Sequence, residues 1–255
     1  MSVGCPEHQK IVALSGGIGG AKLALGLKRV LPMGSLTIIA HTGDDFEHMG
    51  LSISPDIDTL VYTLAGLSDT DRGWGRADET WTFMDSIRAL GGETWFNLGD
   101  GDLAMHVLRS ARLAKGDSLT TITADVCATL EVGARILPMS NQPVRTRLRS
   151  DDGWLDFQDY FVGRQARPVV HEIAYVGNQT AEPAPRQIDA LGASDVAATV
   201  MCPSHPLIRT EPILAVTGIR QALTHASAPV IAISPITAGH SIQGPTAKML
   251  QELGY

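Results

Sequence analysis

The chain has 255 residues, of which 44% are hydrophobic and 18% are charged, a composition that excludes wholesale disorder and permits a sizeable core. The formal net charge is −7 and no segment is dense in Lys and Arg, which argues against nucleic acid as the main partner. No run of about 18 apolar residues is present, so we expect no membrane-spanning helix.

The three cysteines indicate a reducing compartment. Cys5, Cys127 and Cys202 lie far apart and form no CxxC pair, which is typical of buried thiols rather than of a disulfide framework. Residues 1–10 lack the apolar core of a secretion signal. The sequence therefore predicts a cytoplasmic protein.

A βαβ unit is predicted at the start of the chain. The apolar run 11–15 predicts a short buried strand, residues 21–30 a helix, and residues 36–40 a second buried strand. A glycine-rich turn separates the first strand from the helix. Units of this kind build parallel sheets that helices cover.

The remaining elements alternate between helical and strand-like patterns. Helices are predicted at 58–65, 79–90, 102–115 and 118–131, and later at 216–223 and 244–253. Strands are predicted at 144–149, 154–162, 170–176, 197–201 and 229–233, with a hairpin turn at 151–153. We therefore predict a single α/β domain over residues 1–255, with a doubly wound, mostly parallel, Rossmann-like sheet and an inserted helix-rich lobe at about residues 60–190.

The first turn has the chemistry of a phosphate site. Glycine lets a ligand lie against the backbone, and the following helix points free N–H groups and its positive dipole end at that ligand. Lys22 adds a positive charge one turn into the helix. Neither common nucleotide fingerprint is matched, because Lys22 stands where the third glycine of G-x-G-x-x-G would be. Alternatively, the turn is simply tight and binds no ligand. Its four glycines are Gly16, Gly17, Gly19 and Gly20.

Four aspartates follow the second strand: Asp44, Asp45, Asp56 and Asp58. In open α/β sheets the carboxyl ends of the parallel strands line the ligand crevice. Clustered carboxylates at that edge could bind a Mg²⁺ ion that bridges phosphates, or they could orient the hydroxyls of a polyol. Asp58 could instead cap a helix, and Asp44 could belong to an ordinary turn. His41 and His48 lack a paired histidine at ligand spacing, which makes zinc improbable.

Later polar residues carry weaker signals. We interpret Asp102 as a helix N-cap and His106 as a surface or packing histidine. Ser140 and Arg145 could contact a polar ligand, although loop chemistry explains them equally well. Lys248 could reach a phosphate or be solvated, and we favour the solvated interpretation.

The loop after the strand at 197–201 also faces the predicted crevice. Prolines on both sides of Ser204 and His205 favour an extended turn there. No Ser/His/Asp order, nucleophile elbow or HExxH motif appears in the chain. The available chemistry is therefore positioning and charge neutralisation, as in phosphoryl-type transfer without a covalent enzyme intermediate.

Nine motif segments run in order over nearly the whole chain, at residues 15–22, 42–45, 53–59, 73–75, 98–100, 137–140, 202–204, 233–236 and 244–248. Taken together, these segments resemble the 2-phospho-L-lactate transferase family of deazaflavin coenzyme F-420 biosynthesis. Jointly they are far more specific than a glycine loop. A non-catalytic regulatory nucleotide-sugar-binding protein with the same Gly-Gly-x-Gly start is the alternative, and the segments 73–75 and 98–100 favour the transferase.

The resemblance implies a reaction and its partners. A guanosine diphosphate-linked donor passes a phospho-acid, such as phospholactate or phosphoenolpyruvate, to the ribityl hydroxyl of the deazaflavin alcohol Fo, and GMP leaves. It also implies Mg²⁺ and a homodimer. In our hypothesis Asp44, Asp45 and Asp56 hold Mg²⁺, and Asp45 or Asp58 accepts or orients the attacking hydroxyl proton.

The resemblance also implies the substrate contacts. Asp58 and Asn97 should contact the deazaflavin, whereas the glycine turn and the 202–204 loop should contact the donor. The candidate substrate-binding residues are Ser15, Gly16, Gly17, Gly19, Gly20, Lys22, Thr42, Asp58, Asn97, Ser140, Pro203, Ser204 and His205.

The chain departs from the family pattern at four positions. The family usually has a basic residue where Asn97 stands, Arg and Thr where Gly101 and Met105 stand, and commonly Asn where His205 stands. These departures imply a changed deazaflavin contact and a different donor selectivity. The family pattern usually continues beyond Tyr255 with another strand and helix.

Overall fold

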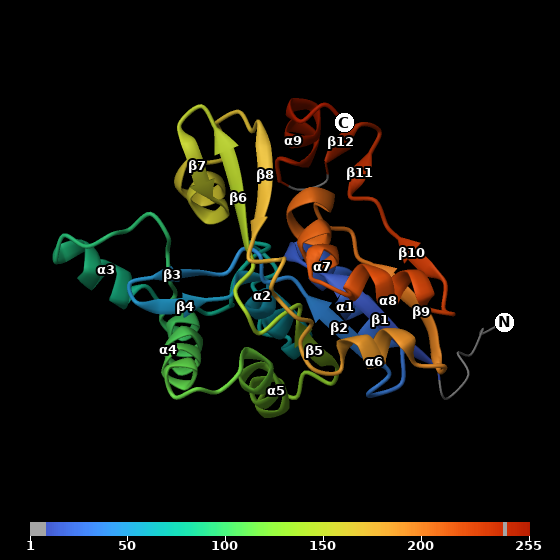
Figure 1. The fold of residues 1–255 in the computed structure, drawn as a ribbon. Helices are drawn as coiled ribbons and strands as arrows, with labels where there is room; N and C mark the ends of the chain where they lie inside the picture. Colours follow the sequence, from blue (N-terminus) through green and yellow to red (C-terminus); the bar gives the residue numbers. More distant parts are fainter. Residues whose placement is uncertain (1–8, 242–243) are drawn as a thin grey trace.

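Five parallel strands form the central sheet of the computed structural model, which describes residues 9–241 and 244–255 (Figure 1). Their order across the sheet is β10-β9-β1-β2-β5, and every pairing is parallel. The strands are β1 (Lys10–Ser15), β2 (Leu36–Ala40), β5 (Arg135–Pro138), β9 (Val196–Met201) and β10 (Val230–Ala232). The predicted α/β class with a doubly wound parallel sheet is confirmed.

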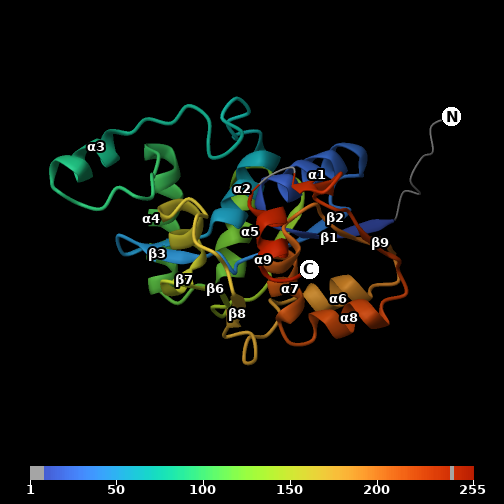
Figure 2. The same ribbon diagram turned by 90° about the horizontal axis from the view of Figure 1, so that it is seen from above.

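Helices cover both faces of this sheet. Successive side chains of a strand point to opposite faces, so Val12 and Leu14 of β1 pack into one core and Ala13 into the other. The Ala13 face is covered by α1 (Gly17–Val30), α2 (Pro55–Ala65) and α5 (Leu119–Thr129), and the opposite face by α6 (Gln187–Gly192), α7 (Glu211–Ala215) and α8 (Ile219–His225). Figure 2 shows α1 and α2 on one side of β1 and β2, with α6 and α8 on the other.

The insertion consists of two segments rather than one. The first follows β2 and contains the hairpin β3 (Phe46–His48) and β4 (Leu51–Ile53) with helices α2, α3 (Thr82–Ala89), α4 (Asp100–Ala114) and α5. The chain then returns to the central sheet as β5, inside the range 60–190 that we assigned to one lobe. The second segment is an antiparallel sheet of order β7-β6-β8, made of β6 (Arg145–Ser150), β7 (Gly153–Asp156) and β8 (Glu172–Val176).

One predicted strand is shorter than expected. The hairpin turn at 151–153 is present, but the strand over 154–162 ends at Asp156, and a π-helical turn η1 (Asp159–Gly163) follows. Phe157 and Tyr160 are buried there against Met249 of α9 (Thr246–Glu252). The apolar residues that suggested a strand therefore serve this small core instead.

The remaining described elements lie at the carboxyl-terminal half of the chain. They are the π-helical turn η2 (Pro206–Thr210) after β9 and the short hairpin β11 (Ile236–Thr237) with β12 (His240–Ser241). Cys127 and Cys202 are buried free thiols, as expected, whereas Cys5 and residues 1–8 lie outside the described residues. Among the described helices, none combines the length and apolar character needed to cross a bilayer.

The strand order fixes where a ligand crevice can form. β2 and β9 flank β1 on opposite sides, so the chain switches direction across the sheet at β1. In open α/β sheets such a switch point opens a crevice beyond the carboxyl ends of the strands. The glycine turn after β1, the segment after β2 and the loop after β9 all begin at this edge.

Candidate active site

Asp56 joins the glycine turn to the segment after β2. Its carboxylate accepts a hydrogen bond from the backbone N–H of Gly17, which has a φ of 68°, and lies 2.7 Å from Nδ1 of His41. The Nε of Arg209, which follows β9, donates to the same carboxylate at 3.3 Å. The glycine turn and the acidic segment after β2 therefore meet at the same edge of the sheet, on the side that we predicted.

Charges around Asp56 outweigh its burial. Burial alone would raise the pKa of Asp56, but the charge of Arg209 and the hydrogen bond with His41 bring that pKa below its usual range. Burial alone would lower the pKa of His41, but the charges of Asp44 and Asp56 raise it. The N–H of Gly43 donates to Nε2 of His41 at 3.1 Å, so a second proton on this ring would break that hydrogen bond.

Asp44 lies beside this pair with unused acceptors. Both of its oxygens are buried without a hydrogen-bond partner in the described part of the chain; Oδ2 lies 3.4 Å from Nη2 of Arg209, and Oδ1 lies 3.9 Å from Nε2 of His41. Burial raises the pKa of Asp44 to about 6, against the opposing charges of His41 and Arg209. His41, Asp44 and Asp56 each offer one ligand atom within 4.8 Å of the others. Orphaned carboxylate oxygens in such a group fit a hard divalent cation.

Asp45 stands outside that three-residue group. One of its oxygens accepts a hydrogen bond from Ser54 at 2.8 Å, and the other is buried with no partner within residues 9–241 and 244–255. Burial raises the pKa of Asp45 to about 7, although the charge of Arg145 and the hydrogen bond from Ser54 oppose the rise. The compact group thus contains His41, which we did not predict as a ligand, rather than Asp45.

The glycines leave room for protein groups. A Cβ added to Gly16 would lie 2.9 Å from Cβ of His41, and one added to Gly17 would lie 3.0 Å from Nε of Arg209. A Cβ on Gly19 would collide with the backbone oxygen of Pro203, and one on Gly20 with Oγ of Ser15. Close packing of other loops on the turn therefore already requires glycine, independently of any ligand.

The loop after β9 packs against the glycine turn. Oγ of Ser204 donates to the carbonyl of Gly16 at 2.5 Å. His205 is buried, and its Nδ1 accepts from the backbone N–H of Leu207 at 3.3 Å, which leaves the ring proton on Nε2. Burial and the charge of Arg209 lower the pKa of His205 to about 3, so the ring is neutral. Its Nε2 has no partner among the described residues.

Residues 11–255 match the family described as 2-phospho-L-lactate transferase CofD. The chain belongs to this family. It is therefore a transferase, and the family implies transfer of a phospho-acid to a precursor of coenzyme F-420. Membership of this transferase family argues against the alternative of a non-catalytic nucleotide-sugar-binding protein.

Proteins named phosphoenolpyruvate transferase are similar over most of the chain. Those of Streptomyces griseus and Kitasatospora aureofaciens are 41% and 42% identical, with 96% of this chain and 78% of each relative covered. The phosphoenolpyruvate transferase of Mycolicibacterium smegmatis is 39% identical over 261 residues, covering 96% of this chain and 79% of its own.

Solved structures agree on the fold. Two crystal structures of protein BH3568 from Bacillus halodurans, one of them described as a member of the UPF0052 family, give TM-scores of 0.60 and 0.58 at 17% identity. They cover 88% and 86% of this chain and 68% and 67% of their own. At this identity the likeness shows the fold alone.

A second buried polar cluster in this transferase surrounds Asp58. The guanidinium of Arg109 donates from Nη2 to Asp58 and from Nη1 to the carbonyl of Ser52 at 3.2 Å. The same Nη1 donates to Nδ1 of His106 at 3.3 Å, so the other ring nitrogen, Nε2, faces Asp102 at 3.2 Å. Burial raises the pKa of Asp58, and the charge of Arg109 opposes this rise.

The interpretation of Asp102 as an N-cap is wrong, and the capping alternative for Asp58 does not apply either. The N-cap of α2 is Ser54, so Asp58 lies inside the first turn, and its N–H donates to the Ser54 carbonyl at 3.0 Å. The N-cap of α4 is Gly99, and Asp102 lies inside the helix, where its carboxylate accepts from the hydroxyl of Tyr62 at 2.7 Å. Asp102, His106 and Arg109 share one face of α4, so their helical spacing in the sequence could have predicted that their side chains lie together. Arg209 had no comparable local signal.

Among the described residues, three other candidate residues make no hydrogen bond or ion pair with either cluster. Ser140 is buried, and its hydroxyl accepts from the backbone N–H of Gln142 at 3.0 Å in a local turn. Lys22 is exposed on α1. Lys248 is ion-paired with Glu252 at 2.7 Å and donates to the carbonyl of Pro168 at 2.8 Å, so it is not simply solvated.

Asn97 lines an open hollow of about 600 Å³. Its other lining residues are Arg72, Trp74, Trp81, Met84, Asp85 and Arg88. Arg72 lies 5.0 and 5.4 Å from the rings of Trp74 and Trp81. The hollow therefore carries two arginines although Asn97 replaces the family's basic residue. The space beside Gly101 is likewise filled by the guanidinium of Arg76.

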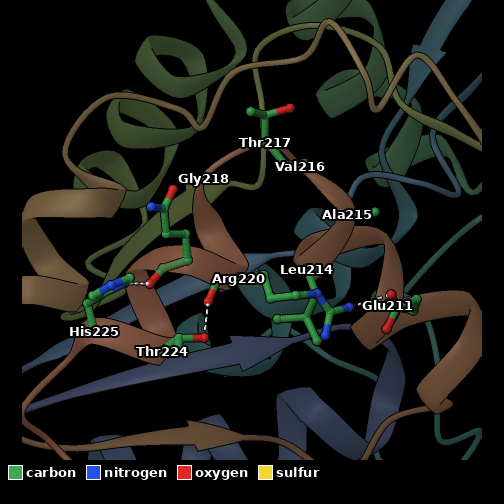
Figure 3. Close-up of a pocket in the computed structure, with 10 residues that line it drawn as sticks. Glu211, Leu214, Ala215, Val216, Thr217, Gly218, Arg220, Thr224 and His225 are labelled. Carbon is green, nitrogen blue, oxygen red and sulfur yellow. Dashed lines mark hydrogen bonds and ion pairs between the residues drawn. The ribbon is translucent and has the colours of Figure 1, made fainter.

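A further hollow of about 490 Å³ lies on α7 and α8 (Figure 3). Arg220 points toward Glu211 across it and pairs with that carboxylate at 2.5 Å, and His225 lies at its far end. It contains none of the predicted site residues.

Proposed function

We propose that this transferase moves the phosphoenolpyruvyl group of a guanosine diphosphate-linked donor to the ribityl hydroxyl of the deazaflavin alcohol Fo and releases GMP. The convergence of the glycine turn with the unpartnered carboxylate of Asp44 carries the proposal, because it brings the amino end of α1, which favours phosphate, beside carboxylate oxygens that suit a cation. The phosphoenolpyruvate transferase names of relatives at about 40% identity favour this acid over phospholactate.

Asp44 and Asp56 would hold Mg²⁺ in this proposal, and His41 would position Asp56 through Nδ1. Support comes from the orphaned oxygens of Asp44 and from the closeness of Asp44 to Asp56. The ion, when bound, supplies charge neutralisation for the donor's diphosphate.

Buried polar groups around the turn would bind the donor. The hydroxyls of Ser15 and Thr42 and Nε2 of His205 are all buried without a partner among the described residues. An unpartnered buried polar group is costly, so each of these groups is suited to a polar ligand atom. Nε2–H of His205 would act as a donor toward an oxygen of the nucleotide.

Asp45 is the better candidate for the general base. One oxygen of Asp45 has no partner among the described residues, and the pKa of its carboxyl group is about 7. A group with a pKa near neutral pH is largely ionised there and still basic enough to accept a proton. In the step we propose, the Fo hydroxyl passes its proton to Asp45 while its oxygen bonds to the phosphorus that carries the enolpyruvyl group. The bond from that phosphorus to the GMP oxygen breaks, and GMP leaves with the electron pair.

Asp58 and the aromatic hollow would hold the acceptor. One oxygen of Asp58 is fixed by Arg109, and the other has no hydrogen-bond partner in the part of the chain that the structure describes, so it could accept from a second ribityl hydroxyl. Trp74 and Trp81 offer aromatic faces for the deazaflavin ring in the hollow that Asn97 also lines.

The direct experiment supplies Fo with Mg²⁺ and the enolpyruvyl or the lactyl form of the guanylyl donor. Mass analysis of the deazaflavin product and measurement of GMP release identify the acid that is transferred. We expect the enolpyruvyl product. Absence of both products and of GMP release would refute the proposed reaction, whereas exclusive lactyl transfer would refute only the choice of acid.

A further inference from the structure

Arg209 contacts both of the carboxylates that would hold the cation. Its Nη2 is 3.4 Å from Asp44 and its Nε is 3.3 Å from Asp56. Its side chain is 20% exposed, whereas those of Asp44 and Asp56 are 1% and 3% exposed. The arginine is therefore the group on the solvent side, and it covers both carboxylates.

The same side chain covers the glycine turn. Cβ atoms added to Gly16 and Gly17 would lie 3.1 Å from Cδ and 3.0 Å from Nε of Arg209. Glycines leave this backbone surface open to a phosphate, and the arginine lies on it. A diphosphate at the turn therefore requires Arg209 either to bind it directly or to move aside.

The attachment of Arg209 to Asp44 is loose. The pair approaches to 3.4 Å, yet neither oxygen of Asp44 receives a hydrogen bond among the described residues. A buried carboxylate without a hydrogen bond is unfavourable, and a divalent cation would satisfy it better than this arginine does. On its other side the guanidinium lies 5.7 Å from the ring of Phe157.

We propose that Arg209 is a displaceable counter-ion: a divalent cation competes with it for Asp44 and Asp56, and the released guanidinium then binds the donor's diphosphate. This inference rests on the proposed function. A divalent cation balances the two carboxylates by itself, which leaves one positive charge free beside the amino end of α1. The planar guanidinium is suited to phosphate because it can donate two parallel hydrogen bonds. Metal binding and diphosphate binding would thus be coupled through one side chain.

The opposing possibility is a static role. In that case Arg209 permanently neutralises Asp44 and Asp56, and its removal weakens the binding of both cation and diphosphate or simply unfolds the chain. The two roles differ in sign for the cation, because removing a competitor strengthens cation binding.

The test uses the full chain and Arg209→Gln, with Arg220→Gln as a matched control. Arg220 is also paired with a carboxylate, but it lies on α8 and is 58% exposed. Binding of Mn²⁺, which takes oxygen ligands like Mg²⁺, is measured without nucleotide by the electron spin resonance of the free ion. Binding of pyrophosphate and of GDP is then measured by calorimetry at saturating Mn²⁺.

We expect Arg209→Gln to bind Mn²⁺ about tenfold more tightly and pyrophosphate about ten- to a hundredfold more weakly, from the loss of charged hydrogen bonds. Arg220→Gln should match the unmodified chain in both measurements. Unchanged or weaker Mn²⁺ binding by folded Arg209→Gln would overturn the inference.

If Arg209→Gln does not fold, the unmodified chain decides the question. The Nε–H nuclear magnetic resonance signal of Arg209, assigned by its loss in Arg209→Lys, should shift when Mg²⁺ is added and shift again with pyrophosphate. A signal that Mg²⁺ leaves in place would refute displacement. The inference and the proposed reaction fail separately: Arg209-dependent pyrophosphate binding without GMP release would refute only the reaction.

Discussion

The carboxylate of Asp56 accepts the backbone N–H of Gly17, although 39 positions separate the two residues in the chain. This contact joins the first turns of α1 and α2, so the positive ends of two helix dipoles meet at one point beyond β1 and β2. Anions are stabilised at such a point, and a cation that bridges Asp44 and Asp56 would complete it. Sequence position alone would not have paired these two residues.

Asp45 should set the pH dependence of the reaction. Because the base must be ionised, kcat should fall as pH drops through about 7, the pKa to which burial raises Asp45, and level off above it. Asp45→Asn should lower kcat by about 10²–10⁴-fold. The measurement is GMP release from pH 5 to 9, and an acid limb that survives in Asp45→Asn would show that another group is the base.

Asp45 should also affect stability, with a defined sign. Its pKa is raised in the folded protein, so its favourable contribution is present below the unfolded pKa of 3.8 and is lost as pH rises through about 7. Asp45→Asn should therefore be more stable than the unmodified chain at pH 8, by on the order of 1–3 kcal/mol, and the gain should shrink toward pH 5. Urea denaturation at both pH values measures this difference, and an equal gain at both would contradict it.

Arg109 should be needed to hold Asp58 in place. Arg109→Gln leaves a buried carboxylate without its cation, which should cost about 3–5 kcal/mol of the free energy of unfolding. Arg112→Gln, three residues along the same helix, removes an exposed pair with Asp117 and Asp125 and should leave the urea midpoint unchanged. Equal midpoints for the two variants would mean that the Asp58 pair is not a stabilising contact.

Two glycines of α1 should respond to alanine in opposite directions. Gly19→Ala should destabilise the chain by about 1–3 kcal/mol, because its Cβ meets the backbone oxygen of Pro203. A Cβ added to Gly26 would have no described atom within 4 Å. Gly26→Ala should therefore stabilise the chain by about 0.5–1 kcal/mol, because alanine has the higher helix propensity. Thermal unfolding of both variants checks the contrast, and a loss in Gly26→Ala would show that α1 tolerates no added methyl group.

Trp81 should contribute to acceptor binding but not to donor binding. Trp81→Ala removes one aromatic face of the hollow that contains Asn97, and the KM for Fo should rise about tenfold while the affinity for GDP is unchanged. Steady-state kinetics with varied Fo and calorimetry with GDP separate the two effects. An unchanged KM for Fo would place the deazaflavin outside this hollow.

The sequence by itself determined the α/β class, the glycine turn after β1 and the acidic segment after β2. Each of these follows from local patterns, namely apolar runs of strand length, helical periodicity and polar residues at strand ends. The positions of Ser15, Asp44 and Asp56 at one edge of the sheet could be predicted because parallel strands end on the same side.

Only the tertiary structure decided which charges meet. Arg209 reaches Asp56 across 153 positions and Arg109 reaches Asp58 across 51, and no local pattern encodes such pairs because loop paths set them. The return of β5 to the central sheet, which splits the insertion, depends likewise on a long-range pairing with β2. Local propensity shapes segments, whereas the partners of buried charges follow from how those segments pack.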